Sequence, residues 1–139
     1  MVPKPHDGSF VRSYPGHASF AADARRDLRE FATASGMEAA DIDDITIAVG
    51  EVLVFAVENI PSLRRGFLLT ARHGKDAISI DISDSAARFG KRIAVRDPQF
   101  ESLAPRGFGM ALIAKLVDEV TLSEGGTRVR MIKRFRAET

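Results

Sequence analysis

The chain contains no cysteine, and this absence removes several classes of chemistry at once. It excludes a disulfide framework, a thiolate nucleophile, and zinc or iron–sulfur centres held by sulfur. A dominant charge is also lacking, because 20 Lys and Arg against 19 Asp and Glu leave a formal net charge of +1. Neither nucleic acid nor a membrane surface is therefore expected as the main partner. The longest apolar stretch, 45–57, is interrupted by Glu51 and is too short to span a membrane. No metal site is predicted, since the spacing of the histidines does not suit metal ligands: His6, His17 and His73.

What is present fits one ordinary globular domain. The 139 residues are 45% apolar and 28% charged, which suits a single domain with its own core. Residues 1–8 are polar and rich in proline, so we expect a loose N-terminal tail followed by one domain over 9–136. The first residues lack the apolar segment of a signal peptide, so we expect a cytoplasmic protein.

Apolar periodicity predicts both strands and helices along the chain. Strands are predicted at 10–14, 66–73, 77–84, 120–123 and 127–132. Helices are predicted at 17–34, at 37–59, and in a third segment that Gly107 opens and whose apolar stripe runs from Met110 to Val120. The stretch 85–106 has no sustained periodicity and contains two prolines, which is typical of a functional connection such as a lid.

The two faces of the strands predict the number of layers. One face carries the apolar residues Ile78, Ile80, Ile82, Val129 and Met131. The other face is polar, with Ser79, Asp81, Ser83, Arg128 and Arg130. A sheet with one polar face takes helices on one side only. The fold class is therefore α/β: a two-layer sandwich with a mixed, mainly antiparallel sheet and its helices on one face.

Two polar residues share the parity of the apolar strand positions. Asp84 continues the series of inward positions at the end of its strand, where a carboxylate needs a donor or a ligand. Thr127 has the inward parity of Val129 and follows two glycines. Together they predict a polar pocket. Taken separately, Asp84 is more often a turn aspartate, and a lone inward Thr is usually a satisfied core hydroxyl.

Two further features could contribute to a ligand site. Gly107 and Gly109 begin a helix beside Arg106, so their backbone amides could cradle a phosphate, although a plain turn explains the pattern about as well. Glu51 lies in an apolar helical run and shares a helix face with Phe55. It is either half-exposed at the flank of the helix or an acid in a pocket.

The ordered set of these features resembles the anti-sigma-factor serine kinases of the GHKL (Bergerat) ATPase superfamily. The resemblance covers nearly the whole chain, from Tyr14 to Phe135. Its segments are the Pro-Gly before the first helix (14–16), the N-box helix (43–51), the G1-box strand (80–84), the G2 box (106–113) and the two closing strands (116–120 and 125–129).

The resemblance implies a fold, a cofactor and partners. The family has a two-layer α/β sandwich, binds ATP with magnesium, phosphorylates a serine of a STAS-domain anti-anti-sigma protein, and sequesters a sigma factor, often as a homodimer. By position, Glu51 would be the general base and Asp84 would receive the adenine amino group, with Thr127 nearby. Gly107 and Gly109, beside Arg106, would approach the phosphates. The stretch 85–105 would be the ATP lid.

Three positions depart from the family pattern at this site. Phe55 stands where the N box has its magnesium-binding Asn, and Ala86 and Arg88 stand where the G1 box has glycines. The sequence therefore favours a degenerate relative that acts by binding a sigma factor or a STAS domain, with weak or absent ATP binding. The alternative is a working kinase whose metal ligands come from Glu51 with Asp44 or Asn59. Without the metal, phosphoryl transfer loses its main charge stabilisation.

Overall fold

The computed structural model describes residues 8–59, 61–84, 92–94, 110–123 and 128–135. Their strands form one six-stranded sheet in the order β1-β2-β3-β6-β5-β4. The strands are β1 (Ser9–Tyr14), β2 (Phe67–His73), β3 (Ala77–Asp84), β4 (Arg92–Ala94), β5 (Glu119–Ser123) and β6 (Arg128–Arg134). The helices are α1 (Ala21–Ala34), α2 (Ala39–Asn59) and α4 (Met110–Leu116), with short 3-10 helices η2 (Ala18–Phe20) and η3 (Pro61–Arg65).

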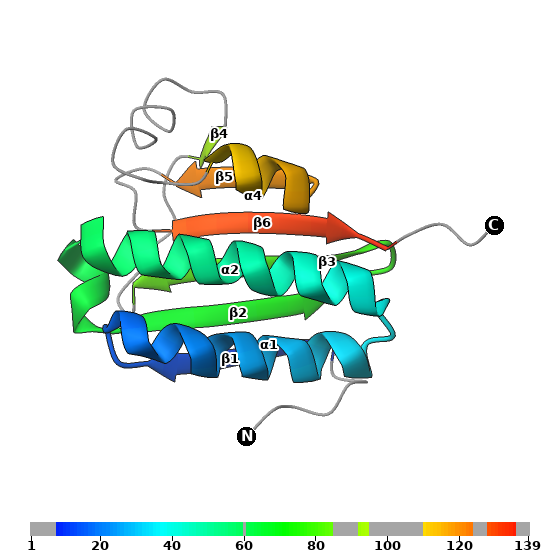
Figure 1. Ribbon diagram of the computed structural model, residues 1–139, viewed down its shortest axis with the longest axis horizontal. Helices are drawn as coiled ribbons and strands as arrows, with labels where there is room; N and C mark the ends of the chain where they lie inside the picture. Colours follow the sequence, from blue (N-terminus) through cyan, green and yellow to red (C-terminus); the bar gives the residue numbers. More distant parts are fainter. Residues whose placement is uncertain (1–7, 60, 85–91, 95–109, 124–127, 136–139) are drawn as a thin grey trace.

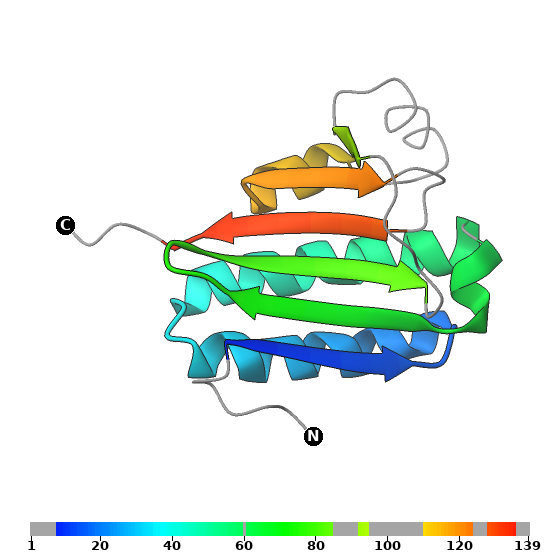
Figure 2. The same cartoon turned by 180° about the vertical axis from the view of Figure 1, so that it is seen from behind.

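All three α-helices in this part of the chain cover the same face of the sheet. Figure 1 shows α1, α2 and α4 in front of the strands, and Figure 2 shows the strands uncovered from behind. The neighbouring strands in the described sheet pair antiparallel. The predicted two-layer α/β sandwich with helices on one face is thereby confirmed, but the sheet, predicted to be mixed, is antiparallel between all its described strands.

Strict alternation along β3 explains how the core forms. Ile78, Ile80 and Ile82 are fully or almost fully buried against the helix layer. From the other side, α1 and α2 contribute buried residues at helical spacing, among them Leu28, Phe31, Ile45, Val49, Val52 and Leu53. The two periodicities, two for the strand and 3.6 for the helices, therefore meet in one apolar layer.

The ends of α1 follow from two local features. The helix begins at Ala21, later than the predicted start at residue 17, because His17 caps the 3-10 helix η2 through its ring nitrogen and the amide of Ser19. It ends, as predicted, at Ser35 and Gly36. Gly36 has a φ of 87°, a conformation that glycine adopts without steric cost.

Two sequence-based assignments need correction. Residues Arg92–Ala94, inside the predicted lid, form strand β4 and pair with Thr121–Ser123 of β5. Helix α4 ends at Leu116, so the apolar stripe predicted to run to Val120 was too long, whereas the strand predicted at 120–123 is present as β5 and contains Val120. Val120 fits both a helical and a strand pattern, so periodicity alone could not place it.

The uncovered face of the sheet carries a compact charged network. Arg130 donates through Nε to Oδ1 of Asp81 at 2.8 Å and through Nη2 to Oδ2 at 3.0 Å. Arg128 adds a bond from its Nε to Oδ1 at 3.3 Å. Because the two arginines flank it, Asp81 is only 5% exposed although it faces away from the helices. These arginines therefore neutralise a buried carboxylate.

A second buried acid joins the edge strand β1 to α1. The Tyr14 hydroxyl donates to Oδ2 of Asp27 at 2.7 Å, and Nη1 of Arg12 lies 3.4 Å from the same oxygen. Burial first, and then the bond to Asp27, raise the pKa of Tyr14 well above its ordinary value.

Candidate nucleotide site

The elements that flank the predicted site residues gather at one end of the molecule. The end of β3, the beginning of β6, the beginning of α4 and the C-terminal part of α2 all lie on the left in Figure 1. Ser83 of β3 pairs with Arg128 of β6, the residue that follows Thr127 in the sequence. Asp84 is the last residue of β3, and its backbone pairs with that of Phe67. These four elements therefore come together at one end of the molecule, as the predicted pocket requires.

Helix α2 carries the other predicted acid on its surface. The Glu51 side chain is exposed, whereas the flanking residues Gly50, Val52 and Leu53 are buried. The sequence left two interpretations of Glu51, a half-exposed residue at the flank of the helix or an acid in a pocket. In the structure its carboxylate is accessible at the flank of α2. A general-base role for it stays a prediction.

Phe55 lies one turn after Glu51 and belongs to the core. Its side chain is only 6% exposed and is part of the main hydrophobic cluster. The ring therefore packs inward instead of extending into solvent. The helical period explains it, because Phe55 follows Val52 by three positions and Ala48 by seven, and both of these residues are fully buried.

The remaining predicted site residues lie outside the described part of the chain. These are Arg106, Gly107, Gly109 and Thr127, together with the departures Ala86 and Arg88. Their roles toward adenine and phosphate stay predictions.

The described residues do not fit a magnesium site at the N-box position. A phenyl ring offers no oxygen, and Phe55 occupies the position where the family pattern has the metal-binding Asn. Within the described ranges, no group of three or more His, Cys, Asp or Glu side chains could hold a metal ion. Asp44, a substitute ligand considered from sequence, lies 3.2 Å from Nζ of Lys133. It is also two turns, or about 10 Å, along α2 from Glu51. We derive no phosphoryl-transfer step from this arrangement.

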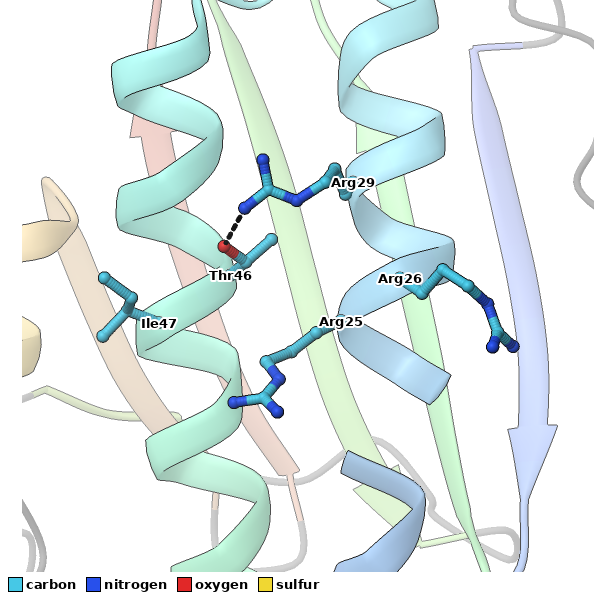
Figure 3. Close-up of a pocket in the computed structure, with 5 residues that line it drawn as sticks. All are labelled: Arg25, Arg26, Arg29, Thr46 and Ile47. Atoms are coloured by element: carbon cyan, nitrogen blue, oxygen red, sulfur yellow. Dashed lines mark hydrogen bonds between the residues drawn. The ribbon is translucent and has the colours of Figure 1, made fainter. Parts of the chain in front are cut away.

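A groove between α1 and α2 was not predicted from the sequence. It has a volume of about 300 Å³ and is lined by Arg25, Arg26, Arg29, Thr46 and Ile47 (Figure 3). The available signal was Gly50, a glycine inside a strongly helical segment, which often marks a close contact.

The described residues form an α/β sandwich whose helices cover one face of the sheet. A family described as the histidine kinase-like ATPase domain matches residues 16–133. The chain belongs to this family, which confirms the superfamily resemblance found in the sequence.

One solved structure agrees with the fold. The chain is similar to the crystal structure of the RsbU and RsbW domains of Rv1364c from Mycobacterium tuberculosis, with a TM-score of 0.67 and 20% sequence identity. The similarity covers 94% of this chain and 33% of that chain, so this chain spans about a third of the length of the crystallised chain. No curated protein matches the chain. In the part of the chain that the structure describes, no helix is long and apolar enough to cross a membrane.

Proposed function

We propose that this chain is a cytoplasmic regulatory module that acts by partner switching. It binds a sigma factor, a STAS-domain anti-anti-sigma protein, or both, and it binds ATP weakly or not at all. The observation that carries the proposal is the buried Phe55, which stands at the N-box position of the metal-binding Asn in a domain of the histidine kinase-like ATPase family.

The physical reason is that phosphoryl transfer depends on the metal ion, whereas protein binding does not. Phosphoryl transfer depends on a metal ion that neutralises charge on the phosphates, so the loss of one oxygen ligand removes much of the rate. Protein binding depends on surface shape and charge, which the folded domain retains without nucleotide. A chain with an intact scaffold and a degenerate metal position therefore suits a binding role.

Calorimetry tests this function directly. The purified protein is titrated with the sigma factors and STAS-domain proteins of its own source, in the absence of ATP. We expect at least one of them to form a stable complex. If none of them binds, with or without nucleotide, the partner-switching function is wrong.

The exposed Glu51 supports an alternative, a working serine kinase. An accessible carboxylate one turn before Phe55 keeps the position of a general base. Incubation with radiolabelled ATP, magnesium and the bound STAS domain discriminates the two functions. The binding module transfers no phosphate, whereas the kinase transfers phosphate and loses this activity on Glu51→Ala.

A further inference from the structure

Two arginines of α1, Arg25 and Arg29, line the groove between α1 and α2. Arg25 and Arg29 are four residues apart on α1 and both reach toward α2 (Figure 3). Arg29 lies beside Thr46, and Arg25 lies beside Gly50. The two helices therefore run antiparallel, and residues four apart on α1 face residues four apart on α2. Arg26 turns to the opposite side of α1 in the same view.

The two groove arginines differ in their partners. Nη2 of Arg29 lies 2.9 Å from Oδ1 of Asp43 and donates to Oγ1 of Thr46 at 3.2 Å, so its position is fixed. Among the described residues, Arg25 has neither a hydrogen bond nor an ion pair. The groove therefore combines an anchored guanidinium with one whose donors are available to a ligand.

Gly50 leaves space on the surface of α2 for the side chain of Arg25. A Cβ atom at this buried glycine would stand 3.0 Å from both Cδ and Nη1 of Arg25, closer than ordinary contacts. Glycine is unfavourable in the interior of a helix. A glycine in the middle of α2 therefore leaves room for the exposed side chain of Arg25 beside the helix.

Apolar side chains continue the surface along α2. Ile47 lines the groove and is 47% exposed, and Val54, two turns later, is 40% exposed. Exposed aliphatic side chains next to a basic groove fit a ligand with both a carboxylate and an apolar side chain. A nucleic-acid backbone would gain nothing from these aliphatic residues.

We propose that this groove is a docking site for an acidic, amphipathic segment of a partner protein. A carboxylate of that segment pairs with Arg25 beside the anchored Arg29, and an apolar neighbour packs on Ile47. The proposal deepens the proposed function, because it rests on the claim that the domain acts by protein contact.

The probe is an amidated seven-residue peptide of alternating glutamate and leucine, followed by NMR on the full chain. We expect the Nε–H signal of Arg25 and the methyl signals of Ile47 to shift on titration. Arg25→Gln should weaken binding about tenfold. Arg72→Gln is the matched control, because Arg72 is exposed on the uncovered face of the sheet, and it should change the affinity less than twofold.

Gly50→Ala separates a binding role from a structural one. Alanine favours the helix, so unfolding in urea should occur at an equal or higher concentration. The new methyl displaces Arg25 and should weaken peptide binding about threefold. Peptide binding that Arg25→Gln and Gly50→Ala both leave unchanged overturns the proposal. It is also overturned if inorganic phosphate or a single-stranded RNA shifts the same signals at lower concentrations than the peptide does.

The natural partners distinguish this proposal from the proposed function. If the sigma factor or STAS domain binds the wild-type chain and the Arg25→Gln variant equally, the docking site is wrong and the partner-switching function stands. If the peptide binds as expected and neither protein partner binds, the groove stands and the partner-switching function is wrong.

Discussion

Replacing Phe55 by Asn tests how far the candidate metal position has become part of the core. The ring is 6% exposed within the main hydrophobic cluster. Truncating a buried Phe costs about 3–5 kcal/mol, and a buried amide without partners adds about 1–3 kcal/mol, part of which local water offsets. We therefore expect Phe55→Asn to lower the free energy of unfolding by about 4 kcal/mol. For a domain of this size that corresponds to about 15 °C in Tm.

Urea unfolding followed by circular dichroism measures this cost. Val54→Asn is the matched control, because Val54 is the neighbouring residue on α2 and is 40% exposed. It should change the free energy of unfolding by less than about 0.5 kcal/mol. A loss below about 1 kcal/mol for Phe55→Asn would mean that the ring is not a core element, and the case against a metal site would lose its structural basis.

Phe55→Asn also tests nucleotide binding, separately from its effect on stability. At a low temperature where the variant remains folded, Asn provides one oxygen at the N-box position. We expect magnesium-dependent ATP binding to return only in part, and further in the triple variant Phe55→Asn, Ala86→Gly, Arg88→Gly. Equal binding by the single and triple variants would refute the role given to the loop after Asp84.

Two further predictions concern the buried carboxylates. Because its pKa is raised in the folded state, Tyr14 contributes stability below pH about 10, and this contribution is lost as the pH rises above that value. The difference in unfolding free energy between wild type and Tyr14→Phe, about 1 kcal/mol at about pH 8, should therefore shrink at about pH 11, and a difference that grows contradicts the bond to Asp27. Asp81→Asn weakens the paired bonds from Arg130 and should cost about 2 kcal/mol in thermal unfolding; a change under about 0.5 kcal/mol would show that the network contributes nothing.

The fold could be predicted where local patterns are strict. Strand β3 was predicted with its observed bounds, because Ile78, Ile80 and Ile82 alternate without exception. Strand β4 was missed, since three residues are too few to show a period. The burial of Asp27 could not be predicted either. It depends on the hydroxyl of Tyr14, thirteen residues away on another element, and no local pattern reports such a contact.

The site was predictable in its framework and less so in its chemistry. Strand β3 ends at Asp84, as predicted, whereas the inward direction that parity gives its side chain stays a prediction. The accessibility of Glu51 could not be decided, because a flank position of a helix is compatible with a pocket or with solvent. The groove that holds Arg25 was missed because it depends on the layer that α1 and α2 share, which only the three-dimensional packing defines.

Titration of the unaltered protein with ATP and magnesium by isothermal calorimetry tests the central claim most directly. With Phe55 buried at the metal position, we predict binding no tighter than about millimolar, or about −4 kcal/mol. Removal of magnesium with a chelator should leave this weak binding unchanged. Micromolar binding that the chelator abolishes would contradict the degenerate site and favour the alternative of a working kinase.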